Sequence, residues 1–114
     1  MRSLLSDRGS ATVFVVIGLA LVLFAGCAMA AVGGLVAAHR RAQSAADLAA
    51  IAGARALGTS REPCAAAAVV AAANAATIED CRASSRDVTL TVSVAGPDLT
   101  GTLIRPRAVA RAGR

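Results

Sequence analysis

Residues 11–38 have the sequence ATVFVVIGLALVLFAGCAMAAVGGLVAA, and this stretch without a charged side chain decides the fold. A helix crosses the hydrocarbon core of a bilayer, about 30 Å thick, with about 20 apolar residues. As a helix, this stretch would extend over roughly 42 Å. It is also longer than the apolar region of a secretory signal, which has about 7–15 residues. We therefore expect a transmembrane helix over residues 10–38, preceded by a cytoplasmic leader over residues 1–9.

Two alternative interpretations place a cleavage site inside this stretch. Residues 28–30 (AMA) have the small-residue pattern that precedes a signal peptidase cut, and residues 24–27 (FAGC) resemble a lipobox that would be lipidated at Cys27. Either cut would leave a secreted or lipid-anchored small extracytoplasmic domain with no role in assembly. The apolar run continues past both cuts to Ala38, which favours the membrane helix, with Cys27 as one of its small apolar residues.

The composition predicts a small core and no catalytic chemistry. Of the 114 residues 56% are hydrophobic, but many are alanine, and the only aromatic residues are Phe14 and Phe24. The net charge of +5 comes from scattered arginines, and without aromatic residues to stack on bases we expect no nucleic-acid partner. One histidine, His39, does not make a zinc site, and no nucleophile motif or phosphate loop is present. We expect no enzyme activity, no cofactor and no metal.

Small residues recur every four positions in the second half of the apolar stretch, at Gly26, Ala30 and Gly34. A row of small residues on one helix face lets two helices approach closely in lipid. We therefore expect these three residues to form a helix-packing face within the membrane.

Residues 39–58 predict an amphipathic extension of the same helix. Ala45, Leu48 and Ala52 fall at three- and four-residue spacing on one face, where they would continue the packing face. The chain's own C-terminal part and neighbouring copies in an assembly are the two candidates to cover this face. The polar side chains of Gln43 and Asp47 lie near the opposite face and are four residues apart. Glycine at position 58 is a helix stop signal, so the expected helix runs from about residue 10 to about residue 57.

The same residues carry a resemblance to a known family. RAQSAADLAAIAGARAL (residues 41–57) and DRGSATV (residues 7–13) resemble the N-terminal module of TadE/TadG-like proteins of the tight-adherence (Flp) pilus assembly system. The RGSATV opening and the small tail with cysteines are similar to a small actinobacterial TadE-like group, encoded near secretion ATPase genes. The resemblance implies other Tad or pilin-like subunits as partners, with a prepilin peptidase and a secretion ATPase or platform complex. Gln43 and Asp47 belong to the matching motif.

A prepilin peptidase site is a further implication of the resemblance. In related pilins the peptidase cuts after a glycine ahead of the apolar helix, which here falls between Gly9 and Ser10. The family pattern has a glutamate five residues after the cut, and this chain has Phe14 there. The alternative is that Gly9 and Ser10 only begin the helix, with Ser10 as its N-cap.

The tail, residues 59–114, predicts a small α/β unit. Residues 61–73 are expected to form a short helix that ends near Asn74, and the chain shifts toward strand from Ile78. Residues 87–94 (DVTLTVSV) alternate polar and apolar, as in a half-buried strand. Residues 96–98 (GPD) predict a turn, and residues 99–110 a strand weakened by proline, with fraying from residue 111. A short helix on an antiparallel sheet of two or three strands is expected.

Cys64 and Cys81 can pair only if the short helix ends early and the chain turns back. A disulfide between them would close a loop of about 17 residues, worth on the order of 3 kcal/mol. It would also require an oxidising compartment, so the tail would lie outside the cytoplasm. The sequence thus predicts a membrane-anchored α+β protein, a non-enzymatic minor pilin or pseudopilin-type component of a Tad apparatus, with a cytoplasmic N-terminus and an extracytoplasmic tail.

Overall fold

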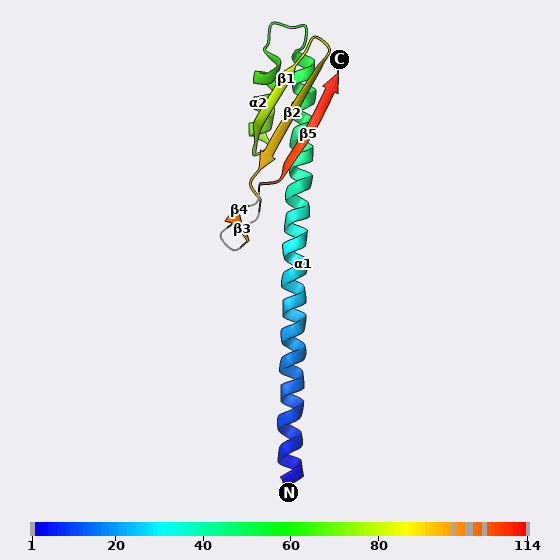
Figure 1. Cartoon of the computed structure of the whole chain (residues 1–114), viewed down its shortest axis with the longest axis vertical. Coiled ribbons are helices and arrows are strands. Elements are labelled where there is room, and N and C mark those ends of the chain that lie inside the picture. The colour runs from blue at the N-terminus through cyan, green and yellow to red at the C-terminus, as the bar shows by residue number, and fades with distance from the viewer. Residues whose placement is uncertain (1, 97, 100–101, 104, 114) are drawn as a thin grey trace. The chain divides into compact units, whose positions relative to one another are not determined.

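The computed structural model describes residues 2–96, 98–99, 102–103 and 105–113 (Figure 1). Its elements, in chain order, are α1 (Arg2–Ala56), α2 (Pro63–Ala73), β1 (Ala76–Ala83), β2 (Asp87–Val94), β3 (Asp98–Leu99), β4 (Thr102–Leu103) and β5 (Arg107–Gly113). The chain divides into two compact units, residues 1–33 and residues 34–114, with the division inside α1. A long apolar N-terminal helix, a short helix and a small antiparallel sheet were expected, and this fold class is confirmed.

Helix α1 begins earlier than its sequence predicts and ends where expected. It is helical from Arg2, so Gly9 and Ser10 lie inside the helix and Ser10 is not its N-cap. At its other end Gly58 adopts a positive φ of 74°, a conformation that glycine takes without strain. The hydroxyl and the backbone N–H of Thr59 both donate to the carbonyl of Ala56, at 2.7 and 3.1 Å, and close the last turn.

The three-stranded sheet has the order β1-β2-β5, and both pairings are antiparallel. Strand β2 has the bounds that its alternation predicts, and β1 begins at Ala76, two residues before the expected change at Ile78. An irregularity between Ile78 and Asp80 leaves Glu79 out of the β1–β2 register.

The C-terminal strand differs from its prediction. Instead of one strand over residues 99–110, the two-residue strands β3 and β4 pair with each other, and β5 starts only after Pro106, whose ring removes a backbone donor. Fraying was expected from Arg111 onward. This prediction is wrong for residues 111–113, because β5 continues to Gly113, which pairs with Asp87. The turn predicted at residues 96–98 includes Pro97, which lies outside the described residues.

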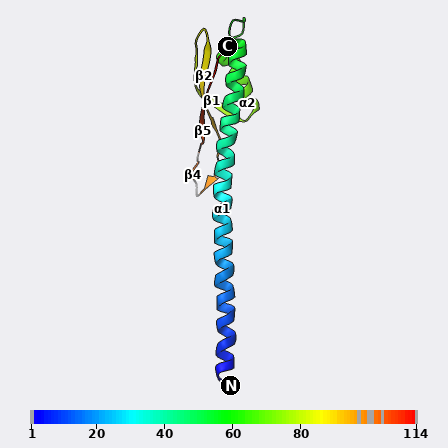
Figure 2. The same ribbon diagram turned by 90° about the vertical axis from the view of Figure 1, so that its right-hand side faces the viewer.

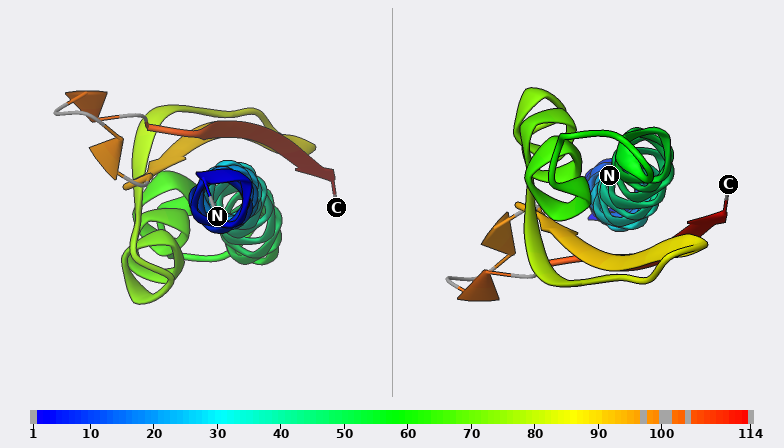
Figure 3. Two further views of the ribbon diagram at one scale, coloured as in Figure 1. Left: turned by 90° about the horizontal axis from the view of Figure 1, so that it is seen from below. Right: turned by 90° about the horizontal axis from the view of Figure 1, so that it is seen from above.

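The core of the second unit lies between the sheet and the two helices. Seen from either end, α2 and the C-terminal part of α1 lie side by side on one face of the curved sheet (Figure 3). Figure 2 shows the sheet edge-on beside α1. Alternate side chains of β2, those of Val88, Leu90 and Val92, are fully buried. They pack in one cluster with small side chains of the helices, chiefly Ala42, Ala45, Ala46, Ala49, Ala50, Ala54, Ala67 and Ala71.

One glycine marks where the helix comes closest to its neighbours. A Cβ atom at Gly53 would lie 3.1 Å from Cγ1 of Val88 and 3.2 Å from the carbonyl oxygen of Pro63. Ordinary van der Waals contact between carbons requires about 3.5–4.0 Å. A side chain at position 53 would therefore require its neighbours on β2 and at the start of α2 to shift by a few tenths of an ångström or more.

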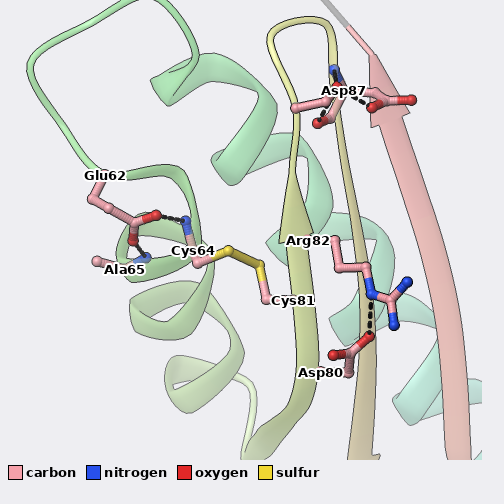
Figure 4. Close-up of a disulfide and its surroundings, with 8 residues drawn as sticks. Glu62, Cys64, Ala65, Asp80, Cys81, Arg82 and Asp87 are labelled. Atoms are coloured by element: carbon pink, nitrogen blue, oxygen red, sulfur yellow. Dashed lines mark hydrogen bonds and ion pairs between the residues drawn. A yellow bond between two sulfur atoms is a disulfide. The ribbon is translucent and has the colours of Figure 1, made fainter.

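Helix α2 is fixed at both ends and by a disulfide. The carboxylate of Glu62 accepts hydrogen bonds from the backbone N–H of Cys64 at 3.2 Å and of Ala65 at 2.6 Å, so Glu62 is the N-cap (Figure 4). Pro63 occupies the first turn, which is why the helix starts two residues later than expected. Asn74 is the C-cap, as predicted. The predicted disulfide joins Cys64 to Cys81 of β1, with the two Cα atoms 6.0 Å apart.

Ala75→Gly is expected to stabilise the second unit. Ala75 has a φ of 55°, a left-handed conformation that costs a residue with a Cβ about 1–2 kcal/mol. Glycine adopts this conformation without strain, but its greater conformational freedom in the unfolded chain offsets part of the stabilisation. The net increase in the free energy of unfolding is about 1 kcal/mol. Thermal unfolding should show a melting temperature about 4–8 °C higher. Ala72→Gly, inside the regular helix, is the matched control and should lower it; a lower melting temperature for Ala75→Gly would contradict the strain.

Candidate membrane and assembly interface

The first half of α1 presents apolar side chains outward on all sides. Among the described residues, the helical segment Gly9–Ala56 is long and apolar enough to cross a membrane, and none of its most apolar window is buried. Phe14, for example, is 73% exposed. In water such a surface would be unfavourable by about 25 cal/mol per Å², so it needs an apolar surrounding. Length and composition thus make this segment the candidate membrane contact.

The predicted packing residues in this half have little or no cover within the chain. Gly26 has no atom within 4 Å of where a Cβ would lie, Ala30 is exposed and Gly34 is half-buried. This surface is therefore free to accept another helix, and packing there stays a prediction. Cys27 is an exposed free thiol on the same segment.

In the second half of α1, the three residues of the predicted packing face differ in how far they are buried. Ala45 is buried in the core of the chain's own tail, but Leu48 is 46% exposed and Ala52 is half-buried. The sheet thus covers the alanine face, so the chain's own tail, not a partner helix, covers Ala45. The predicted face is rotated from the buried one because alanine occupies nearly every position here, which leaves the periodicity weak.

The outward side of this half carries polar and apolar residues together. The side-chain amide of Gln43 donates to the Asp47 carboxylate at 3.2 Å, four residues along the helix. Leu48 and Ile51 follow and remain exposed, the latter by 44%. On this surface the two motif residues and two large apolar side chains occupy adjacent turns.

A groove of about 750 Å³ lies between the end of α1 and α2. Its lining is mainly apolar and includes Ala52, Ala66 and Val69, of which Val69 is 71% exposed. Charged residues stand among its lining, namely Arg55, Arg61 and Glu62. The groove has the shape and chemistry to accept an apolar side chain or the face of a further helix.

Three residues with a possible chemical or processing role, His39, Gly9 and Ser10, lie exposed on α1. His39 is exposed on α1, and the described residues contain no group of three or more His, Cys, Asp or Glu that could hold a metal ion. Gly9 and Ser10 are exposed on helical backbone. A peptidase that cuts an extended substrate there would first have to unwind this turn.

An ion-pair network joins the β1–β2 turn to β5. The Ser84 hydroxyl donates to the Asp87 carboxylate at 2.5 Å, and Nε of Arg111 donates to the same carboxylate at 2.6 Å. The bond from Ser84 and then that from Arg111 favour the ionised form and lower the pKa of Asp87 below its ordinary value of 3.8. The network ties the edge strand β5 to the central strand at the end of the sheet.

The lowered pKa of Asp87 predicts a pH dependence of stability. Because the folded state favours the carboxylate, its contribution is complete above pH 3.8 and is lost as the pH falls toward the folded-state pKa. Asp87→Asn should therefore flatten the acid limb of a plot of melting temperature against pH, and Ser84→Ala should flatten it partly. An acid limb unchanged in Asp87→Asn would contradict the assignment.

A comparison with known protein families finds a match over most of helix α1. Residues 9–56 match the model of the Tad family, described as putative Flp pilus-assembly TadE/G-like. The match ends with α1 and leaves the tail uncovered. No curated protein and no solved structure shows significant similarity to the chain. Residues 9–56 are therefore similar to the TadE/G-like domain of Flp pilus assembly, in agreement with the resemblance carried by residues 7–13 and 41–57.

Three features of the structure described above were not predicted from the sequence. Ile51 could have been found, because it follows Leu48 at three-residue spacing. The α1–α2 groove depends on how two helices lie on a sheet, which no local pattern encodes. The bond between Ser84 and Asp87 has a recognisable signal, a serine three residues before an aspartate in a short turn.

Proposed function

We propose that the protein is a single-pass membrane component of a Flp/Tad pilus assembly or secretion system, of minor pilin or pseudopilin type and without enzyme activity. The observation that carries the proposal is the coincidence of two properties in residues 9–56. This segment matches the TadE/G-like model, and it contains an exposed apolar helix long enough to cross a bilayer. Residues 10–38 would form the span, residues 39–58 its extension and residues 59–114 the tail.

The disulfide supports the proposed orientation. Disulfides persist in oxidising compartments and are rare in the cytoplasm, so the bond between Cys64 and Cys81 favours an extracytoplasmic tail. A single span then leaves residues 1–9 in the cytoplasm. Gly9 and Ser10 would stand at the cytoplasmic membrane edge, where a prepilin peptidase could reach them.

Partner subunits would contact the parts of α1 that the tail leaves uncovered. Within the membrane these are Gly26, Ala30 and Gly34, which allow close helix approach. Outside the membrane they are Leu48, Ile51 and the groove beside Ala52. We propose a helix of another Tad or pilin-like subunit as the occupant, with the secretion ATPase or platform complex acting on the assembly from the membrane.

Leu48→Glu is expected to weaken association with partner subunits. A charge at this position would be buried without a partner when a second helix packs on it, which costs several kcal/mol. In-cell crosslinking to Tad subunits should fall at least about tenfold. Val109→Glu is the matched control, because Val109 is exposed on the other face of the sheet, and should leave crosslinking unchanged. Equal crosslinking in Leu48→Glu and the unmodified chain would contradict the proposed surface.

Two measurements on the full chain in its cell test the proposed function. After alkaline carbonate extraction the protein should remain in the membrane fraction. Intact-mass analysis should then find either Met1 or, after peptidase processing, Ser10 at the amino terminus. A lipidated Cys27 at the amino terminus, or a soluble product that begins after Ala30, would instead support a lipid-anchored or secreted small domain and would overturn the proposal.

A further inference from the structure

A second groove lies where the apolar part of α1 ends. It has a volume of about 450 Å³ and is lined by Leu35, Val36, His39, Arg40 and Pro106. The first two belong to the last turn of the uncharged stretch, and His39 begins the polar part of the helix. Pro106 comes from the segment that enters β5, and its carbonyl accepts a hydrogen bond from the backbone N–H of Val94 at 3.1 Å. The groove is therefore built jointly by the helix and the end of the sheet.

The apolar and the basic side chains at this groove lie at different heights along the helix. Leu35 and Val36 are 40% and 48% exposed, and Pro106 completes an apolar floor. Arg40 stands one helical turn further along, and Arg105 directly precedes Pro106; both are exposed. The other basic residues of the sheet differ, since Arg82, Arg107 and Arg111 each pair with a carboxylate. Arg40 and Arg105 have no such partner among the residues whose side chains the structure describes.

We propose that this groove binds one anionic phospholipid of the leaflet on the tail's side, with its acyl chain against Leu35, Val36 and Pro106 and its phosphate between Arg40 and Arg105. The inference rests on the proposed single span, which puts residues 35–40 at the boundary between hydrocarbon and headgroups. A phospholipid has an apolar chain and an anionic group at this same boundary. The groove offers an apolar floor and one lining cation, Arg40, and Arg105 is the neighbour of its Pro106 in the chain. A small soluble anion would leave the floor uncovered.

The binding would also fix the tail against the membrane. Arg40 belongs to the helix and Arg105 to the segment between β2 and β5, so one phosphate would join both elements at the bilayer surface. The lipid would then hold the sheet at the headgroup level, between the two parts of α1 that partner subunits are proposed to contact.

Native mass spectrometry of the full chain tests this proposal. The protein is released from detergent micelles that contain phosphatidylglycerol and phosphatidylcholine with identical acyl chains, in equal amounts. We expect one retained phosphatidylglycerol and weaker retention of phosphatidylcholine. An arginine near an anionic surface contributes about fivefold in affinity, so Arg40→Gln with Arg105→Gln should lower retention about 30-fold. Glycerol phosphate, which lacks acyl chains, should not compete.

The control is Arg86→Gln, which removes an exposed arginine at the opposite end of the sheet and should retain the lipid as the unmodified chain does. Melting temperatures show whether each variant is folded. Equal retention of the two phospholipids, loss of lipid in Arg86→Gln, or unchanged retention in the double variant would overturn the lipid site. Protein that stays in carbonate-washed membranes but shows no lipid selection overturns this inference alone, whereas release by carbonate overturns the membrane anchoring as well.

Discussion

Replacement of both Cys64 and Cys81 by alanine is expected to lower the free energy of unfolding of residues 34–114 by about 3 kcal/mol. The bond closes a loop across a sequence separation of 17 residues and so restricts the unfolded chain. It also joins α2 to β1, the outer strand next to that helix. The core can compensate little, because apart from four β2 side chains and Leu57 its buried cluster is built of alanines.

Urea denaturation of the full chain in detergent, followed through the far-ultraviolet signal of the sheet, measures this effect. The double variant and the reduced unmodified chain should show the same lower midpoint. Cys27→Ala is the control, because Cys27 is a free exposed thiol on the apolar part of α1 and should leave the midpoint unchanged. An oxidised chain and a double variant with equal midpoints would contradict a stabilising disulfide.

Gly53→Leu is expected to destabilise the same unit by about 3 kcal/mol, at the upper end of the cost of overpacking. The new side chain would enter space held by Val88, which is fully buried, and by the Pro63 carbonyl, which belongs to the backbone. The Pro63 oxygen can move only with the backbone, and the Val88 side chain is enclosed in the core. α1 would have to separate from the sheet, which would expose the buried alanines between Ala42 and Ala54.

Gly33→Leu is the matched control, since no atom lies within 4 Å of a Cβ built there. Leucine is a better helix former than glycine by about 1 kcal/mol, so this control should keep or raise the melting temperature. Gly53→Ala should lie between the two, because its gain in helix propensity offsets part of the close contact. A Gly53→Leu variant as stable as the unmodified chain would contradict the packing of α1 on the sheet.

The parts of the fold with strong local signals were predictable from the sequence. The uncharged stretch predicted the long helix, and the DVTLTVSV alternation predicted both ends of β2 correctly. Asn74 predicted the end of α2, and a helix that ends there permits the disulfide between Cys64 and Cys81. Each of these depends on a period of two or 3.6 residues or on one residue with a restricted backbone.

Other parts could not be predicted because tertiary contacts decide them. In residues 37–57 alanine is so frequent that several faces look alike, and the sheet selects the one with Ala45 and Ala49 while Leu48 stays outside. The expected C-terminal strand was misplaced because Pro106 breaks it, and pairing with β2 then carries β5 on to Gly113. The groove at Leu35 and Pro106 joins residues far apart in sequence, so no motif could indicate it.

A spin-label accessibility scan of α1, in the full chain reconstituted in lipid nanodiscs, tests the central claim most directly. The claim is that one helix serves first as a membrane span and then as a core helix of the tail. Labels at positions 14, 21 and 29 should be accessible to oxygen and shielded from a water-soluble nickel complex, position 48 should be accessible to the nickel complex, and position 49 should be shielded from both. Nickel access at position 21, or free access to both reagents at position 49, would contradict the account.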